Sequence, residues 1–253
     1  MRSLIYKRDL LFNLVQRDIK LHYRRSILGI LWAQINPLLS LIIFSFVFQT
    51  LVPLNIPNYS AYVFTGLLAW NWFSASLNGA NYSLINSRDL VRKPQFQTEM
   101  IVAASVATNM VNYLLALPVL LGLLLINGLV PNWTIIFLPL LLAIQYAFTM
   151  GLALLISATN VFFRDVLHIV AVLTSVWFYL TPVFYSIASR SDYQWVINLN
   201  PLYHFLIAYR QIFIAGQPPD FTLLALLTLL AVAVYGLGYS VFHRLKYSFV
   251  DEL

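Results

Sequence analysis

Long apolar stretches alternate with short polar segments along the chain. No Asp, Glu, Lys or Arg occurs between Arg25 and Arg88, nor between Glu99 and Arg164. Because lipid offers no hydrogen-bonding partners, such stretches cross a membrane as helices whose backbone groups pair internally. About 20 mostly apolar residues span a hydrocarbon core of roughly 30 Å. Cut to this length, the stretches predict six transmembrane helices: residues 30–51, 59–85, 100–126, 133–160, 166–185 and 221–242.

The composition supports an all-α integral membrane protein. Hydrophobic residues make up 60% of the 253 positions and charged residues only 9%, whereas about a quarter of the residues in a soluble protein are charged. A water-soluble enzyme, a coiled coil, a disordered chain and a nucleic-acid-binding protein are therefore disfavoured. Cysteine is absent, which excludes disulfides, thiolate catalysis and cysteine metal sites.

Basic residues predict the orientation. Thirteen of the 15 Lys and Arg residues fall on one side of the predicted helices, and only Arg190 and Arg210 fall on the other. Cytoplasmic segments retain positive charge, so both termini are predicted to be cytoplasmic. The net charge of +6 then reflects this orientation and attraction to anionic headgroups. The predicted organisation is an interfacial helix at 1–29, a six-span domain at 30–246 and a cytoplasmic tail at 247–253.

The segment before the first predicted span has the 3.6-residue period of an amphipathic helix. We expect it to lie flat on the inner leaflet, where it either anchors the chain or also supports a cytoplasmic partner. Its apolar face consists of Leu4, Leu11, Val15 and Ile19, and its polar face of Asn13, Arg17, Lys20 and Arg24.

The connection at 86–99, with the sequence NSRDLVRKPQFQTE, is short and charged. A solvated loop that follows the positive-inside rule would account for its basic residues. A docking surface for a cytoplasmic protein would use the same charges. The candidate docking residues are Arg88, Asp89, Arg92, Lys93 and Pro94.

The predicted spans lack the groups that drive ion-coupled transport. No acid or base lies in a span interior, and His168 is only one turn inside the fifth; carriers coupled to protons or sodium usually keep such groups there. The chain also has no GxxxxGK[ST] phosphate loop, HExxH or GxSxG motif. We therefore expect a transport protein whose energy source is elsewhere, with no catalytic residues and no metal site.

Uncharged polar residues recur at helical spacing within the spans. In the second span they form one stripe, Ser105, Thr108 and Asn112 repeat the pattern in the third, and the fourth contains Gln145, Thr149 and Asn160. Interhelical hydrogen bonds would explain them, as would the lining of a path for a neutral, hydroxyl-rich substrate. The stripe of the second span consists of Asn71, Ser74, Asn78 and Asn81.

Aromatic residues offer a second set of candidates for a path or a gate. Interface belts account for many of them, while stacking on sugars is the alternative for Tyr59, Tyr62, Trp70 and Trp72. Residues 186–220 are too apolar for a solvated loop and too interrupted for a span. They are expected to form short outer re-entrant helices, either a gate or a surface cap, and the candidates there are Trp195 and Tyr203.

Four motifs together resemble one family. The stretch YRRSILGILWAQINPLL at 23–39 resembles the opening of type-2 ABC exporter permeases for O-antigen, capsular polysaccharide and teichoic acid, where an interfacial helix leads into LGxLWxxxxP. NVFFRDV at 160–166 is similar to the family's NxFFRD segment, and TPVFY and NP follow in the family's order. The matching positions are Gly29, Trp32, Pro37, Asn160, Phe163, Arg164, Asp165, Pro182 and Pro201.

The resemblance implies a permease that pairs with a second copy and with two cytoplasmic ABC ATPase subunits. ATP and Mg²⁺ would bind the ATPase, so this chain needs no cofactor of its own. The interfacial helix (Arg17, Lys20, Arg24) and the 86–99 connection would contact the ATPase, and the outer re-entrant pair would form the gate. The implied substrate is a polysaccharide carried on a lipid in a bacterial plasma membrane.

Other functions stay open at this stage. A related type-2 permease could move another lipid or a drug, and an ion-coupled carrier is a third possibility. An intramembrane enzyme acting on lipid-linked sugars would need charges gathered at helix ends. Asp89, Glu99, Arg164 and Asp165 are the residues available for that role.

Overall fold

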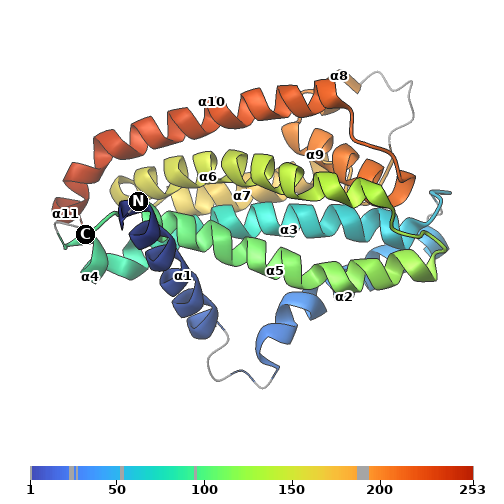
Figure 1. Ribbon diagram of the computed structural model, residues 1–253, viewed down its shortest axis with the longest axis horizontal. Helices are drawn as coiled ribbons and strands as arrows, with labels where there is room; N and C mark the ends of the chain where they lie inside the picture. Colours follow the sequence, from blue (N-terminus) through green and yellow to red (C-terminus); the bar gives the residue numbers. More distant parts are fainter. Residues whose placement is uncertain are drawn as a thin grey trace.

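The computed structural model describes residues 2–22, 26, 28–51, 54–93, 96–186 and 194–252. Throughout these residues, every regular element is a helix. The long helices run side by side along the longest axis of the molecule (Figure 1). Together with the composition, this arrangement supports the predicted all-α architecture.

Helices occupy each of the predicted spans. Four of them are long and apolar enough to cross a membrane: Trp32–Leu51, Glu99–Ile126, Trp133–Phe162 and Phe221–Ser248. The chain is therefore a multi-pass membrane protein. The elements are α2 (Trp32–Ser45) continued by the π-helix η2 (Phe46–Leu51), α3 (Tyr59–Ser83), α5 (Glu99–Ile126), the 3-10 helix η4 (Trp133–Phe137) continued by α6 (Leu138–Phe162), α7 (Val166–Leu180) and α10 (Phe221–Leu245).

Two predicted spans differ from these four. Helix α3 has 25 residues, but its polar stripe keeps its hydropathy low. Helix α7 has only 15 residues and ends at Leu180, five residues before the predicted end. Thr181 is extended, with φ −101° and ψ 124°, as expected for a residue that precedes a proline. At 1.5 Å per residue, α7 is about 22 Å long. The count of six spans stays a prediction.

The short elements gather at the two ends of the bundle. One end holds the start of α1 (Arg2–His22), the 3-10 helix η3 (Ile85–Ser87), α4 (Arg88–Val91), η6 (Lys246–Ser248) and α11 (Phe249–Glu252). The opposite end carries α8 (Gln194–Asn198), α9 (Pro201–Arg210) and the π-helix η5 (Gln211–Ala215). Helices α8 and α9 and η5 all lie within residues 186–220, the segment predicted to be re-entrant.

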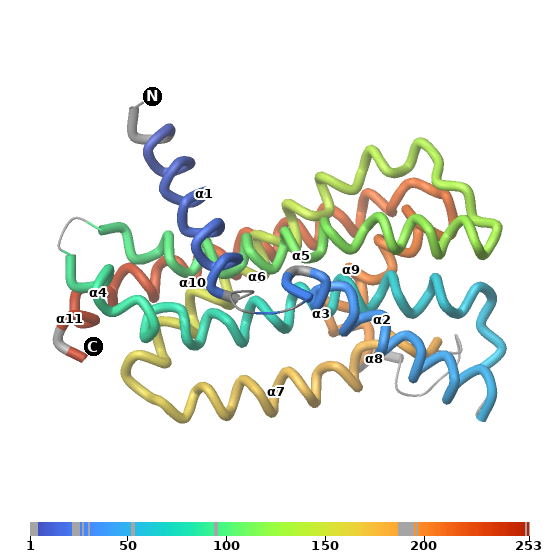
Figure 2. Tube along the Cα trace, turned by 90° about the horizontal axis from the view of Figure 1, so that it is seen from below, coloured from blue at the N-terminus to red at the C-terminus, as the bar shows by residue number. Residues whose placement is uncertain are grey.

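Helix α1 packs obliquely against α5 (Figure 2). Leu14 is buried, and Leu11 and Val15 are partly buried. Arg17, expected on the polar face, is also only partly exposed: its Nη2 donates to Asp18 Oδ1 at 3.0 Å and to Ser87 Oγ at 3.5 Å. The buried face of α1 is centred on Leu14, so Arg17 borders the bundle. Lys20 is exposed as predicted, and Arg24 lies outside the described residues.

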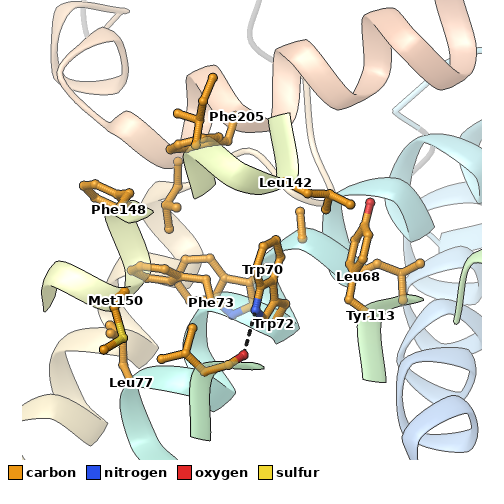
Figure 3. Close-up of a cluster of buried hydrophobic side chains, with 14 of the residues drawn as sticks. Leu68, Trp70, Trp72, Phe73, Leu77, Tyr113, Leu142, Phe148, Met150 and Phe205 are labelled. Atoms are coloured by element: carbon orange, nitrogen blue, oxygen red, sulfur yellow. Dashed lines mark hydrogen bonds between the residues drawn. The ribbon is translucent and has the colours of Figure 1, made fainter. Parts of the chain in front are cut away.

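The core is centred on α3. Trp70, Trp72, Phe73 and Leu77 are each 5% exposed or less and pack with side chains of α5, α6 and α9 (Figure 3). Aromatic rings in such clusters bury a large apolar area and hold a fixed mutual geometry. Because this helix is tightly held, its remaining faces can carry polar groups in defined positions.

Candidate functional site

Three cavities surround α3. The α2–α5 cavity has a volume of about 370 Å³ and lies among α2, α3 and α5. The α1–α5 cavity, of about 580 Å³, lies among α1, α3, η3 and α5. The α2–α7 cavity, of about 400 Å³, lies among α2, α3 and α7. Asn78 lines all three, so it marks the place where they adjoin.

The predicted polar stripe of α3 divides between these cavities and the core. Asn71 and Ser74 line the α2–α5 and α2–α7 cavities. Asn81 is only 2% exposed, and its backbone carbonyl accepts a hydrogen bond from Asn160 Nδ2 at 2.6 Å. Asn71, Ser74 and Asn78 thus border cavities, whereas Asn81 lies in the contact between α3 and α6.

Two side chains of this stripe donate hydrogen bonds within α3. Asn78 Nδ2 donates to the Ser74 carbonyl at 2.8 Å, and Ser74 Oγ donates to the Asn71 carbonyl at 3.4 Å. Asn78 Oδ1 accepts no hydrogen bond from the described residues. Because an amide carries two N–H donors as well as an acceptor oxygen, Asn78 keeps both donor and acceptor capacity toward the cavities.

Trp70 and Trp72 are core residues that also border cavities. The Trp70 ring lies 5.4 Å from Phe178 between centroids and lines the α2–α7 cavity. Trp72 Nε1 donates to the Val106 carbonyl at 3.4 Å, the dashed line in Figure 3, and lines the α2–α5 cavity. Both rings are fixed by neighbours, and only part of each is available to a substrate.

Tyr59 and Tyr62 hold the segment that follows α7. Their hydroxyls donate to the carbonyls of Phe184 at 2.9 Å and Tyr185 at 3.0 Å. Their immediate role is thus to fix the backbone of the TPVFY motif. Neither tyrosine lines any of the three cavities.

Arg210 completes this arrangement, although the sequence did not single it out. Its Nη2 donates to the carbonyls of Pro182 and Val183, both at 2.9 Å. Its guanidinium carbon lies 3.5 Å from the centroid of the Tyr62 ring. Burial lowers the pKa of the Arg210 guanidinium to about 10, so the group stays charged at neutral pH. One cation thus joins α3, α9 and the turn after α7.

The TP and NP motifs meet in one hydrogen-bond network. Asn200 Oδ1 accepts from Trp177 Nε1 at 2.9 Å and from the Leu202 backbone N–H at 3.0 Å. Its Nδ2 donates to Thr181 Oγ1 at 2.8 Å. Asn200 therefore caps α9, which begins at Pro201, and ties it to the end of α7.

The two remaining gate candidates lie on or beside these outer helices. Trp195 of α8 is 64% exposed. Tyr203 is partly buried, with its ring 5.3 Å from that of His204. Neither lines the three cavities.

The candidate docking residues lie at the other end of the bundle. Arg88, Asp89, Arg92 and Lys93 are exposed on α4 and the turn that follows it. Pro94 lies outside the described residues. The exposed Phe163, Arg164 and Asp165 form the connection from α6 to α7.

The opening family motif contributes to a cavity wall. Gly29 has φ +50°, a conformation that favours glycine. Trp32 and Pro37 line the α2–α5 cavity. The motif therefore builds the turn before α2 and one side of the polar space.

Asn36, Ser40 and Asn109 line the α2–α5 cavity and were missed as site candidates. The signal was present on α5, where Ser105, Asn109 and Asn112 are spaced four and three apart and so share one helix face. Asn36 and Ser40 of α2 are likewise four apart. A search for uncharged polar pairs at this spacing on every apolar helix would find them.

A multi-pass helical bundle with polar cavities between its helices has the architecture of a membrane permease. Residues 9–214 match the model of the ABC-2 type transporter family, and the chain belongs to this family. It is 35% identical to the O-antigen export system permease protein RfbA of Myxococcus xanthus, over 100% of this chain and 98% of that protein. Two Klebsiella pneumoniae proteins of the same name are 31% and 30% identical, over 99% of this chain and 97% of each.

Proposed function

We propose that the chain is the permease subunit of an ATP-driven exporter that moves lipid-linked polysaccharide across a bacterial plasma membrane. The observation that carries this proposal is the set of three cavities around Asn78, whose walls in the apolar bundle include amides, hydroxyls and aromatic rings. Amides and hydroxyls are the partners that sugar hydroxyls need. The names of the full-length relatives point to the same class of substrate.

The proposed assembly contains two copies of the permease and two cytoplasmic ABC ATPase subunits. Membership of an ABC transporter family implies the ATPase, which would bind ATP and Mg²⁺. The starts of α1 and α4 and the whole of α11 lie at one end of the bundle, in agreement with both termini on the cytoplasmic side. Helices α8 and α9 then lie on the outer side and form the gate, with Asn200 and Arg210 fixing α9 to the end of α7.

Reconstitution tests this function. Proteoliposomes that contain the chain and the ABC ATPase of the same transporter should export a lipid-linked polysaccharide only when ATP is present. Vesicles with the permease alone should export none. Export driven by a proton or sodium gradient without the ATPase would refute the proposal, as would turnover of the glycolipid by the purified chain.

The double variant Arg92→Glu/Lys93→Glu should uncouple ATP hydrolysis from export. Both residues are exposed next to α4, so reversing their charge leaves the core unchanged and opposes an acidic partner surface. Export should fall by at least tenfold, which corresponds to about 1.4 kcal/mol of docking energy. Arg244→Glu is the control, because Arg244 is exposed at the same end of the bundle on α10. Equal export by both variants would contradict docking at α4.

Asn78→Leu should slow export without unfolding the protein. Asn78 faces the cavities and makes its one side-chain hydrogen bond within α3, so leucine removes the polar lining and narrows the path. We expect export to fall about tenfold, equal to ~1.4 kcal/mol in the barrier, with an unchanged melting temperature in detergent. Asn81→Leu is the matched comparison, since its site lies in the α3–α6 contact and should lower the melting temperature instead. The reverse pattern would assign Asn78 to packing.

A further inference from the structure

Four rings follow one another along the exposed side of α10 and η6. Tyr235, Tyr239, His243 and Tyr247 are spaced four residues apart, so they share one helix face, and we call them the α10 aromatic row. Neighbouring rings lie 6.2, 5.7 and 6.0 Å apart between centroids. The three tyrosines are 40%, 41% and 72% exposed in chain order. Because α10 forms one edge of the molecule (Figure 1), the row faces the surroundings of the bundle.

The polar atoms of the row have no hydrogen-bond partners within the described residues. The side-chain hydrogen bonds that α10 makes there come from Thr228 and Ser240, which donate to carbonyls of their own helix. The hydroxyls of Tyr235 and Tyr239 thus remain able to donate and accept. Hydrocarbon offers such groups no partner, whereas the glycerol ester carbonyls of a phospholipid do.

The row crosses the boundary between acyl chains and headgroups. A hydrocarbon core of roughly 30 Å takes about 20 residues of helix, so a span that begins with α10 at Phe221 ends close to Phe242. At 1.5 Å per residue, Tyr235 lies about 10 Å inside this boundary and Tyr239 about 5 Å inside it. His243 lies at the level of the headgroups.

Positive charge lies at the headgroup end of the row. Lys246 Nζ is 5.3 Å from the centroid of the Tyr247 ring, and that ring packs edge-on against His243. The ion pairs of the described residues both lie within α1, so the Lys246 charge is left for an external anion. Glu99 acts electrostatically on Tyr235, at the opposite end of the row. The charge along the row therefore matches an anion at one end and not at the other.

The C-terminal helix holds the basic end in a fixed position. Phe249 of α11 is fully buried and packs against Phe162 of α6 and Phe242 of α10, with centroids 6.1 and 5.3 Å apart. Lys246 and Tyr247 lie on η6, between two anchored helices. Groups that are already ordered lose less freedom when a ligand binds.

We propose that the α10 aromatic row binds one anionic phospholipid from the leaflet beside the C-terminus, which is the inner leaflet in the proposed orientation. The phosphate pairs with Lys246 and accepts an N–H bond from His243. The ester carbonyls accept hydrogen bonds from Tyr239 and Tyr235, and the acyl chains lie along exposed apolar residues of α10 such as Val232. The site goes beyond the proposed function, because it requires that α10 lie in a membrane but no particular exported substrate.

Native mass spectrometry of the full-length permease in detergent measures the affinity for each added lipid. Dioleoyl phosphatidylglycerol and dioleoyl phosphatidylcholine share their acyl chains and ester groups and differ in the net charge of the headgroup. The wild type should bind phosphatidylglycerol about fivefold more tightly, the usual effect of one basic residue on an anionic lipid. Glycerol phosphate in the buffer should not compete, because it lacks the ester carbonyls and acyl chains.

Two charge variants distinguish a site from general attraction to the membrane surface. Lys246→Gln should remove the preference for phosphatidylglycerol, and Lys246→Arg should restore it. Arg244→Gln is the matched control, since it removes the same charge from an exposed residue of the same helix. Arg244 follows His243 by one residue, so it lies about 100° further round the helix, and this variant should keep the preference.

A third variant tests the ester contact. Tyr239→Phe keeps the ring and removes the hydroxyl, so it should weaken both lipids equally, by about fivefold for one hydrogen bond. All of these residues are exposed or partly exposed, and the melting temperature without added lipid should stay unchanged in each variant. Phosphatidylglycerol at ~10 times its Kd should raise the melting temperature of the wild type and of Arg244→Gln more than that of Lys246→Gln.

Several outcomes would overturn this assignment. Equal affinity of the wild type for the two lipids would remove the preference for an anion. Equal losses in Lys246→Gln and Arg244→Gln would indicate diffuse attraction, and unchanged binding by Tyr239→Phe would place the lipid elsewhere. Competition by glycerol phosphate would identify a soluble phosphate as the ligand. None of these results depends on export, so the lipid site and the permease function succeed or fail separately.

Discussion

The Gly238→Ala variant is expected to lose most of its folded population in detergent. A Cβ at Gly238 of α10 would collide with the carbonyl oxygen of Gly151 of α6. The Gly151→Ala substitution meets a similar obstacle, since a Cβ at Gly151 would lie 2.6 Å from the backbone nitrogen of Tyr235. Small residues allow helix backbones to approach closely in membranes. Because backbone atoms cannot move aside as a side-chain tip can, the whole α6–α10 contact must open.

The expected cost is about 3 kcal/mol, the upper end of the usual penalty for overpacking. Gly236→Ala is the matched control on the same helix, because a Cβ there meets nothing within 4 Å. Alanine is a better helix former than glycine by about 1 kcal/mol, so this variant should melt at the same temperature or higher. Thermal melts followed by size-exclusion chromatography measure both. Similar melting of the two variants would disprove the close α6–α10 contact.

The positions of the helices could be predicted from the sequence, whereas their lengths were less certain. Charge-free stretches are long-range signals that lipid imposes on the whole segment, and a helix begins within two residues of each predicted start. The end of α7 depends instead on a local effect, the extended Thr181 before Pro182. The polar stripe of α3 lowers the mean hydropathy of that helix, so it does not qualify as a span by length and hydropathy. The number of spans therefore cannot be decided from composition alone.

The candidate site was predictable in kind but not in detail. Spacing placed Asn71, Ser74, Asn78 and Asn81 on one face of α3, yet it could not show that Asn81 meets α6 while Asn78 meets open space. That difference is set by a neighbouring helix about eighty residues away in the chain. Resemblance to the family gave the class of protein correctly, because ordered motifs along the whole chain are more specific than any one stripe.

Arg210 illustrates why some groups escape sequence analysis altogether. Its partners are two backbone carbonyls, 27 and 28 residues earlier, and every residue type provides a carbonyl. Only Tyr62 could have been recognised as a side-chain partner, and it lies on another helix. Arg210, one of the two basic residues that the predicted orientation leaves apart from the other thirteen, is therefore a structural tie between α9 and the turn after α7.

The Arg210→Met variant should weaken this tie and with it both stability and export. Methionine keeps an unbranched apolar stem but donates no hydrogen bonds, so the carbonyls of Pro182 and Val183 lose their charged donor. Hydrogen bonds to charged groups contribute about 1.5 to 3 kcal/mol each, and a desolvated cation over an aromatic ring about 2 kcal/mol. These terms are not additive, and we expect a net loss of about 3 kcal/mol, measured as a lower melting temperature.

Two further variants separate charge from geometry. Arg210→Lys keeps the charge but lacks the planar fork of donors, so its melting temperature should fall between those of the wild type and Arg210→Met. Tyr62→Phe keeps the ring under the guanidinium and removes the hydroxyl, with its bond to the Tyr185 carbonyl and its interaction with Arg210, a loss of about 1 kcal/mol. If Arg210→Met melted like the wild type, the tie would be absent. If it melted lower yet exported at the wild-type rate per folded molecule, α9 would be a surface cap, because a gate that is no longer held to α7 must change the rate at which polysaccharide passes.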